Sequence, residues 1–262
     1  MKISIITVAY NAGATISDTI RSVIAQDHTD YEHIIVDGGS TDDTLDRARA
    51  LSHSKLCLVS EPDTGIYDAM NKGLQRATGG LIGFLNADDF YCRTDSLAKF
   101  SRIAEATSLD AVASGIVIVN QKRPERVQRS YPSRGFRPWM LRLAYMPPHP
   151  GFYVRREAAQ KVGYFDPTLR FGADFDWIMR FYLIHQMRAA LVPESLVAMR
   201  TGGKSQELSG IHEGRRDTIR SLRAHGLGAF SPLVWGKYII KAPQFLALAS
   251  KFPVPEHLLW TP

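Results

Sequence analysis

The first hundred residues alternate short apolar runs with stretches of helical periodicity. The apolar runs predict strands over Ile3–Tyr10, His33–Asp37, Lys55–Ser60 and Leu81–Leu85. Between these runs, apolar residues three or four apart predict helices over Ala14–Gln26, through Leu45, Ala48 and Leu51, and over Ile66–Ala77. Strands that alternate with helices of this length are typical of an α/β protein with a mostly parallel central sheet flanked by helices.

Beyond Asp110 the pattern becomes less regular. It predicts strands at Asp110–Val119, Arg126–Tyr131, Gly151–Val154 and Ser195–Met199, and helices over Asp174–Ile184, Gly210–His225 and Leu233–Ser250. We therefore expect one domain over residues 1–205, with halves at 1–109 and 110–205, followed by a C-terminal helical extension over 206–262.

Composition indicates a folded globular protein, with 45% hydrophobic and 22% charged residues in 262. The formal net charge is +6, and nine basic residues against four acidic ones follow from Met199 onward. This charge favours anionic partners without selecting nucleotide diphosphates, lipid headgroups or nucleic acid. Neither of the two cysteines belongs to a C-x-x-C pair, so a reducing, cytoplasmic setting is expected. Apolar runs are too short to span a bilayer, so membrane contact would be peripheral.

Polar residues follow all four strands of the first half. In open α/β sheets, ligands bind beyond the carboxyl ends of the strands, where loops and helix N-termini converge. One rim should therefore collect the polar residues that follow the strands: Tyr10, Asn11, Asp37, Asp63, Asp88 and Asp89.

Adjacent carboxylates follow the fourth predicted strand in the segment Asn86-Ala87-Asp88-Asp89. Carboxylate oxygens are suitable ligands for Mg²⁺ or Mn²⁺, and such an ion can bridge a diphosphate and neutralise the charge of a departing phosphate. The same segment also fits an Asx turn that caps the next helix.

Two further polar segments have both a ligand-binding and a structural interpretation. Asp37, before Gly38-Gly39, can accept hydrogen bonds from a base or ribose, or can simply form a tight turn. Asp63, Asp68, Asn71 and Lys72 lie close together after the third strand and favour a donor site, although Asp68 and Lys72 also have the spacing of a helix-surface pair.

Asp174 lies in the first turn of a predicted amphipathic helix. A reaction in which a hydroxyl group attacks needs a carboxylate to remove the proton of that hydroxyl, and Asp174 is our candidate for this base. The alternative role is helix capping. His149, between two prolines, and Lys204, in Gly202-Gly203-Lys204-Ser205, are candidates for acceptor or phosphate contacts; a structural histidine and a plain surface loop are the alternatives.

Five motifs together resemble the family-2 glycosyltransferases, particularly bacterial enzymes that assemble cell-surface polysaccharides and glycolipids. The resemblance spans roughly Ile3 to Ser205 and rests on Ile5–Asn11, Val36–Asp42, Gly65–Gly73, Phe84–Asp89 and Ala173–Asp176, in the family's order. The chain has Ala173 where a glutamate is commoner and Asn86 where an aspartate is commoner.

The resemblance implies a GT-A type nucleotide-diphospho-sugar transferase fold and a role for each matched residue. It implies nucleoside contacts for Thr7, Tyr10 and Asp37, a ribose or sugar contact for Asp88, a metal for Asp89 and the base for Asp174. Residues 1–205 would then form the catalytic domain, with the nucleotide-sugar half before the acceptor half.

The expected activity is an inverting transfer from a nucleoside-diphosphate sugar, a UDP-sugar in our interpretation, to a hydroxyl of a saccharide or lipid-linked saccharide. The cofactor would be Mn²⁺ or Mg²⁺, and no nucleic-acid partner is expected. Trp235–Leu246 mixes aromatic, aliphatic and basic residues, which favours either the inner face of the plasma membrane or packing on the catalytic domain or on another subunit.

Three other classes are less consistent with the sequence. A nucleotidyltransferase would need a Gly-rich, basic N-terminal loop, for which Asn11-Ala12-Gly13-Ala14 is a poor substitute. A nicotinamide dehydrogenase would need G-x-G-x-x-G after the first strand, and that pattern is absent. A non-catalytic nucleotide-sugar sensor would release no nucleoside diphosphate, and the presence of both Asp89 and Asp174 argues against it.

Overall fold

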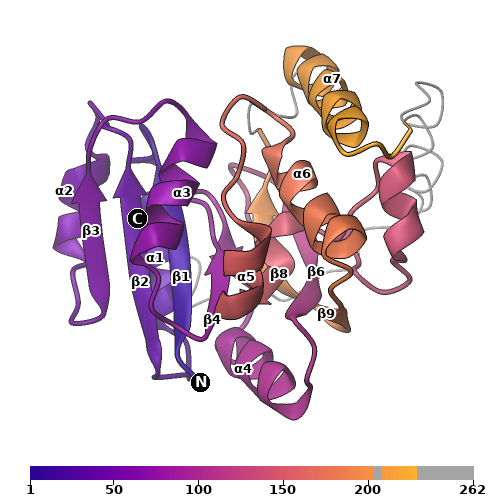
Figure 1. Ribbon diagram of the computed structural model, residues 1–262. Coiled ribbons are helices and arrows are strands. Elements are labelled where there is room, and N and C mark those ends of the chain that lie inside the picture. Colours follow the sequence, from indigo (N-terminus) through magenta and orange to yellow (C-terminus); the bar gives the residue numbers. More distant parts are fainter. Residues whose placement is uncertain (203–207, 229–262) are drawn as a thin grey trace.

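The computed structural model describes residues 1–202 and 208–228. Within them, a nine-stranded sheet has the order β3-β2-β1-β4-β8-β6-β9-β5, with β7 paired to β6 (Figure 1). The strands are β1 Ile3–Ala9, β2 Tyr31–Asp37, β3 Leu56–Ser60, β4 Leu81–Phe84, β5 Phe90–Tyr91, β6 Ala111–Val119, β7 Val127–Tyr131, β8 Phe152–Arg155 and β9 Ala189–Arg200.

The sheet is parallel in its first half and mixed in its second. Strand β1 pairs in parallel with β2 and β4, and β2 pairs in parallel with β3. Strand β8 then joins β4 and β6 in antiparallel fashion, while β6 and β9 run parallel. The carboxyl ends of β1, β2, β3 and β4 therefore share one edge, as the sequence pattern predicts.

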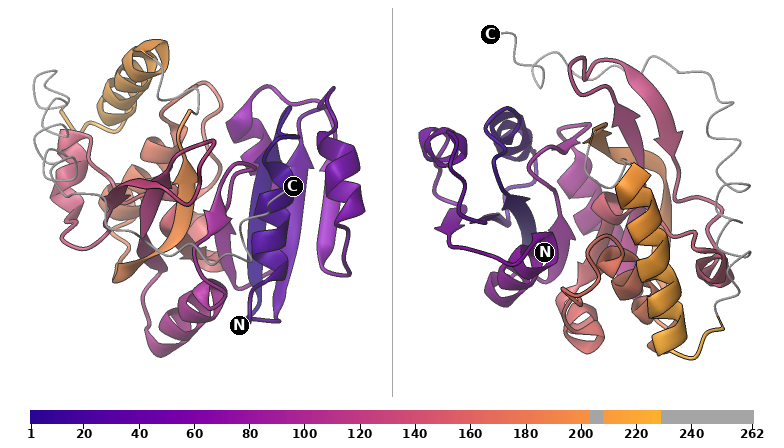
Figure 2. Two further views of the ribbon diagram at one scale, coloured as in Figure 1. Left: turned by 180° about the vertical axis from the view of Figure 1, so that it is seen from behind. Right: turned by 90° about the horizontal axis from the view of Figure 1, so that it is seen from above.

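Helices cover both faces of this sheet (Figures 1 and 2). They are α1 Ile16–Ile24, α2 Thr44–Ala50, α3 Ile66–Arg76, α4 Ser96–Ala106, α5 Arg156–Val162, α6 Ala173–Met179 and α7 Leu208–Ala224, with 3-10 helices η1 Pro138–Leu143 and η2 His149–Gly151. Helices α3, α5 and α6 contribute to one hydrophobic cluster. On the opposite face, α4 and the end of α1 pack in a second cluster, and α1 and α2 pack in a third.

The α/β architecture is confirmed, and the main differences lie in the second half. Strand β9 starts at Ala189, six residues before the predicted strand, and its pairing with β6 shifts register near Gly115. Pro193 and Glu194 interrupt the apolar pattern there, which hides the first part of this strand. The predicted helix over Gly210–His225 is confirmed as α7, whereas the helix predicted over Leu233–Ser250 lies outside the described residues.

No helix in the described part of the chain combines the length and apolar character that crossing a bilayer requires.

Strand β2 contains a fully buried histidine. His33 in β2 is fully buried, and its Nε2 lies 2.9 Å from the hydroxyl of Thr7 in β1. Its Nδ1 has no hydrogen-bond partner, and the ring of His53 stacks on it at 6.4 Å. Burial, and secondarily His53, lowers the pKa of His33 from 6.5 to about 3. The folded protein therefore holds this histidine neutral at pH values at which the unfolded chain protonates it.

We predict that stability falls as the pH is lowered from 6.5 toward 3. Above pH 6.5 His33 is neutral in both the folded and the unfolded state and does not lower the free energy of unfolding. Below pH 6.5 only the unfolded state gains the proton. Between pH 7.5 and 5 this residue should account for a loss of roughly 2 kcal/mol, at about 1.36 kcal/mol per pH unit. Urea unfolding of the parent and of His33→Asn at both pH values measures it; equal pH dependence of the two proteins would contradict it.

Candidate functional site

The loops after β1 and β2 are fastened to each other at the carboxyl edge of the sheet. Asn11 has a φ of 50°, and its Oδ1 accepts a hydrogen bond from Thr41 N at 2.9 Å. Its own N–H donates to Ser40 Oγ at 2.8 Å, and Gly13 N donates to Asp42 Oδ2 at 3.0 Å. Tyr10, at the start of this loop, is 60% exposed. A rigid rim thus presents one large aromatic ring to solvent.

Asp37 ends β2 and shapes the turn that follows it. Its Oδ2 accepts hydrogen bonds from Gly39 N at 3.1 Å, Ser40 N at 3.0 Å and Ser60 Oγ at 2.8 Å, and its Oδ1 accepts one from Ser40 Oγ. The carboxylate is fully buried. Thr7 lies a layer deeper, also fully buried, where it contacts His33. In this structure, the Asp37 carboxylate therefore stabilises the turn after β2. Thr7 is buried below the rim and exposes no atom there.

The polar residues that follow β3, between Asp63 and Lys72, pack on the same edge of the sheet. A Cβ on Gly38 would come within 2.2 Å of Asp63 Oδ2, so the carboxylate of Asp63 covers that glycine. Lys72 donates to the carbonyl of Pro62 at 2.7 Å and lies 3.7 Å from Asp68, so the helix-surface pair is present and also ties down the loop.

Asn71 is used differently from its neighbours. Its Nδ2 donates to the carbonyl of Phe165, and its Oδ1 accepts from Phe165 N, both at 2.9 Å. It thereby holds the loop before α6 against α3.

Asp88 and Asp89 follow β4, and the two carboxyl groups have different surroundings. Asp88 is partly exposed, whereas Asp89 is 1% exposed. Neither oxygen of Asp89 accepts a well-formed hydrogen bond, and Asn86 Oδ1 also lacks a partner. Burial, followed by the neighbouring Asp88, raises the pKa of Asp89 well above its usual value. These oxygens lie at the end of a strand with their coordination unsatisfied.

Arg200 is a member of this site that local sequence patterns did not reveal. It is 4% exposed, its Nη1 donates to the carbonyl of Asp88 at 2.9 Å, and its Nη2 pairs with Asp18 at 2.5 Å. The guanidinium also lies over the ring of Phe90, 4.9 Å from its centroid. It lowers the pKa values of Asp88 and Asp89, against the larger effect of burial. Its partner Asp18 is 182 positions away, so no spacing rule could have paired them.

Asp174 is brought together with a tyrosine and with the predicted His149. Asp174 Oδ1 accepts from the hydroxyl of Tyr67 at 3.2 Å and from Phe175 N at 2.8 Å. His149 is 6% exposed, and its Nε2 has no hydrogen-bond partner. Burial lowers the pKa of His149, while the nearby charge of Asp174 acts in the opposite direction.

An aromatic cluster connects this group to the strand that carries the carboxylate pair. His149 stacks on Phe84 at the end of β4 with a centroid separation of 5.1 Å. Phe165 lies 5.3 Å from Phe84 and 5.8 Å from Tyr67. The end of β4 therefore carries Asn86–Asp89 directly and supports Asp174 through two layers of rings.

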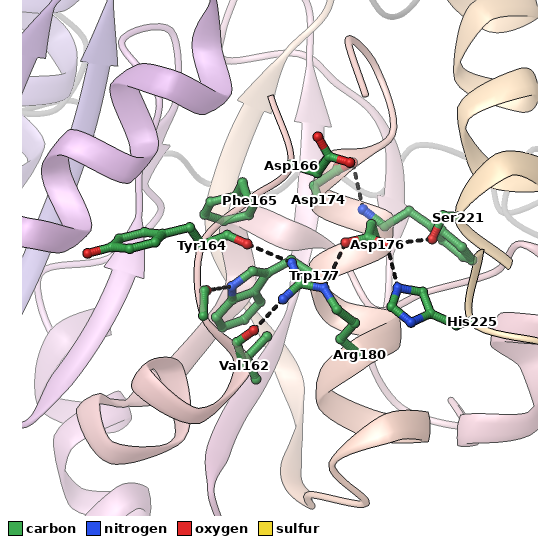
Figure 3. A network of polar contacts seen from close by, with 12 residues as sticks. Val162, Tyr164, Phe165, Asp166, Asp174, Asp176, Trp177, Arg180, Ser221 and His225 are labelled. Atoms are coloured by element: carbon green, nitrogen blue, oxygen red, sulfur yellow. Dashed lines mark hydrogen bonds and ion pairs between the residues drawn. The ribbon is translucent and has the colours of Figure 1, made fainter. Parts of the chain in front are cut away.

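Helix α7 contacts the chain on both sides of Asp174, and Figure 3 shows the contacts of Asp176 on one side. The buried Asp176 accepts from Arg180 Nε at 2.8 Å and from Ser221 Oγ at 2.7 Å, and lies 3.4 Å from His225 Nε2. On the other side, Asp217 Oδ2 accepts from Phe171 N at 2.8 Å. The segment that contains Asp174 is thus anchored at residues 171 and 176.

The remaining candidates are Lys204 and the metal-binding carboxylates. Lys204 lies outside the described residues. Across residues 1–202 and 208–228, no three His, Cys, Asp or Glu side chains converge as a metal cluster, so the Asp88–Asp89 pair would need ligands from a bound molecule or water to complete a coordination shell.

Comparison with protein families gives one match that covers most of the sheet. The model described as "Glycosyl transferase family 2" matches residues 4–172. An uncharacterized glycosyltransferase of Mycobacterium tuberculosis is 32% identical over 187 residues, which are 70% of this chain and 69% of that protein. A PGL/p-HBAD biosynthesis glycosyltransferase of the same organism is 37% identical over 119 residues, 44% of this chain. The alignment spans only 46% of that relative's length.

Solved structures share the fold over nearly the whole chain. The structure of S. aureus TarS 1–349 has a TM-score of 0.65 to this chain at 19% sequence identity. The alignment covers 98% of this chain and 82% of the TarS chain. A mannosyltransferase from Pyrobaculum calidifontis, in complex with GDP-Man and Mn²⁺, has a TM-score of 0.64 at 21% identity, over 98% of this chain and 71% of that one. The predicted GT-A type fold is confirmed by these likenesses together with the family match.

We predict that Ser221→Ala destabilises the protein, because the buried Asp176 carboxylate loses one of its donors. The expected decrease in the free energy of unfolding is about 1.5–3 kcal/mol, the usual contribution of a hydrogen bond to a charged group. Urea denaturation measures it, with Ser52→Ala, at an exposed position after α2, as the matched control. Equal stability of the two variants would show that α7 does not depend on this contact.

Proposed function

Because the chain belongs to glycosyl transferase family 2, we propose that it transfers a sugar, with inversion, from a nucleoside-diphosphate sugar to a hydroxyl of a saccharide or lipid-linked saccharide. That it is a glycosyltransferase follows from the family. The donor, acceptor, stereochemistry and residue roles are our proposal, and the observation that carries them is the placement of Asp174 and Asp88–Asp89 around the end of one strand.

Asp174 is the proposed base. Both hydrogen bonds that it accepts, from Tyr67 and from Phe175 N, go to Oδ1, and Oδ2 accepts none from the described residues. Oδ2 is therefore free to take the proton of the acceptor hydroxyl as that oxygen forms its bond to the anomeric carbon. The bond between the anomeric carbon and the diphosphate oxygen breaks in the same displacement, and the diphosphate leaves with the electron pair. A single displacement inverts the anomeric centre.

The rim is the proposed donor site. Exposed Tyr10 is available to stack on the base, and Asp63 and the partly exposed Asp88 are available to ribose and sugar hydroxyls. Other predicted donor residues act by holding the loops in place: Asn11, Asp37, Asp68, Asn71 and Lys72. A UDP-sugar is the proposed donor, supported by the complexes of TarS with UDP and with UDP-GlcNAc.

The residues at the end of β4 fit a divalent cation. Three oxygens there, two of Asp89 and one of Asn86, are buried without partners, and hard oxygen ligands are those that Mg²⁺ and Mn²⁺ prefer. Asp89, with Asp88 beside it, would hold the ion, which when bound neutralises charge on the diphosphate. The Mn²⁺ in the mannosyltransferase complex supports this assignment.

The acceptor half is proposed to work at the cytoplasmic face of the membrane in bacterial polysaccharide or glycolipid biosynthesis. The PGL/p-HBAD biosynthesis relative supports the biosynthetic role. We retain residues 1–205 as the catalytic domain and 206–262 as the extension; the docking of α7 on α6 supports an extension that serves the catalytic domain. The segment Trp235–Leu246, proposed for membrane contact, lies outside the described residues.

Replacement of the proposed base should slow transfer strongly without weakening donor binding. Asp174→Asn keeps an oxygen that can accept from Tyr67 but cannot take up a proton, so we expect the transfer rate to fall roughly 10²- to 10⁴-fold. The measurement is UDP release from a panel of UDP-sugars with pooled saccharide acceptors, alongside calorimetric UDP binding. Asp46→Asn, on the exposed face of α2, is the control. Full transfer by a folded Asp174→Asn protein would refute the assignment.

Loss of the buried carboxylate should remove the response to Mn²⁺. With UDP present, Mn²⁺ should raise the unfolding temperature of the parent by several degrees, because binding to the native state stabilises it. Asp89→Asn should show no such rise, although without metal it should be at least as stable as the parent, since it no longer buries an unpaired carboxyl group. Asp95→Asn, six residues further along, should respond as the parent does; a full Mn²⁺ response by Asp89→Asn would exclude the site.

A further inference from the structure

An excess of positive charge surrounds an exposed tryptophan in the acceptor half. Residues 121–143 contain seven Lys and Arg side chains and one acidic residue, Glu125, so this segment alone carries an excess equal to the net charge of +6 of the whole chain. Trp139, in η1, is 56% exposed. Arg134, Arg137 and Arg142 around it are also exposed. A large exposed aromatic ring among unopposed charges indicates an interaction surface.

Helix α7 adds a second row of arginines. Arg216, Arg220 and Arg223 are spaced by four and three residues, so they share one face of the helix, and all three are exposed. The opposite face, with Ser221 and Leu222, is buried. No hydrogen bond or ion pair joins these three arginines to another residue in the described ranges. They are therefore available to an external anion.

The two rows meet at the C-terminal end of α7. Arg142 Nη1 donates to the carbonyl of Leu227 at 3.3 Å, and both views show η1 beside this end of the helix (Figures 1 and 2). We call the surface formed by these residues the arginine surface; it consists of Arg134, Arg137, Trp139, Arg142, Arg216, Arg220 and Arg223.

We propose that the arginine surface docks the enzyme on an anionic phospholipid bilayer. Guanidinium groups pair with phosphate oxygens in a planar, two-point geometry, and each basic side chain near an anionic leaflet adds to the attraction. A tryptophan among such charges is typical of the membrane interface, where the ring lies at the level of the headgroups. Single-stranded nucleic acid is instead bound by several aromatic rings in a groove, and Trp139 is the one exposed aromatic among the described residues 121–143.

The buried side of the same segment leads to the candidate base. Phe136, Leu141 and Tyr145 belong to the hydrophobic cluster that also contains Ala173 and Phe175, the neighbours of Asp174. Docking through the arginine surface would hold the acceptor half close to the bilayer, where a lipid-linked acceptor resides; this step rests on the proposed function. The membrane contact itself depends only on the exposed charges and the indole ring.

Vesicle flotation of the full chain tests the proposal. The parent should bind vesicles of phosphatidylcholine with 30% phosphatidylglycerol at low salt, bind pure phosphatidylcholine far less, and be released at high salt. Arg134→Gln, Arg137→Gln and Arg142→Gln together should weaken binding roughly a hundredfold, and Trp139→Ala should weaken it severalfold. The control variant removes the same charge from helices α2 and α4, on the other face of the sheet, through Arg47→Gln, Arg49→Gln and Arg102→Gln. It should bind vesicles as the parent does.

Each alternative has its own outcome. Equal vesicle binding by the parent and the arginine variant would overturn the proposal and assign membrane binding to another part of the chain. Retention by single-stranded oligonucleotides, lost in the arginine variant, without any vesicle binding would replace the bilayer with nucleic acid. UDP release measured without vesicles should be unchanged in the arginine variant, and vesicle binding should be unchanged in Asp174→Asn, so failure of the catalytic assignment and failure of the docking assignment are separable.

Discussion

Burial of the Asp89 carboxylate beside the partly exposed Asp88, at the end of β4, is the constraint on which the rest of the site depends. Asp89 is fully enclosed, and its charged form is opposed by burial and by Asp88 beside it. Arg200 opposes this only in part, because its guanidinium also pairs with Asp18. An arrangement of this kind is unfavourable by itself, and a divalent cation with a diphosphate would satisfy it. The unsatisfied oxygens are the reason why we propose a ligand at this strand end.

The opposite side of the proposed reaction depends on rigid support of Asp174. Catalysis by proton transfer requires the base to be held within hydrogen-bond reach of the acceptor. Tyr67 fixes one carboxylate oxygen, while α7 anchors the chain before Asp174 through Asp217 and after it through Asp176. The family match ends at residue 172, so this support comes from a part of the chain that lies beyond it. Helix α7 is therefore part of the architecture around the proposed base.

Much of the fold could be predicted from the sequence, and the features that could not be predicted have physical causes. Apolar periodicity located the four parallel strands, and their shared edge placed Tyr10, Asp37, Asp63 and Asp88 on one rim. Periodicity could not show that Thr7 is fully buried or that Asp37 is used by its own turn, because both depend on neighbours from other strands. Arg200 was not predicted as a site residue for the same reason, since only the fold brings it to Asp18 and Asp88. The roles of the site residues remain predictions.

A crystal structure with UDP and Mn²⁺ tests the central claim most directly. Mn²⁺ should contact a carboxylate oxygen of the Asp88–Asp89 pair and the diphosphate at about 2.0–2.6 Å, the range for hard cations with oxygen ligands. Asp174 Oδ2 should face the space beyond the diphosphate, with Oδ1 still bound to Tyr67. A diphosphate bound away from β4, or Asp174 closed off from it by protein, would contradict the account.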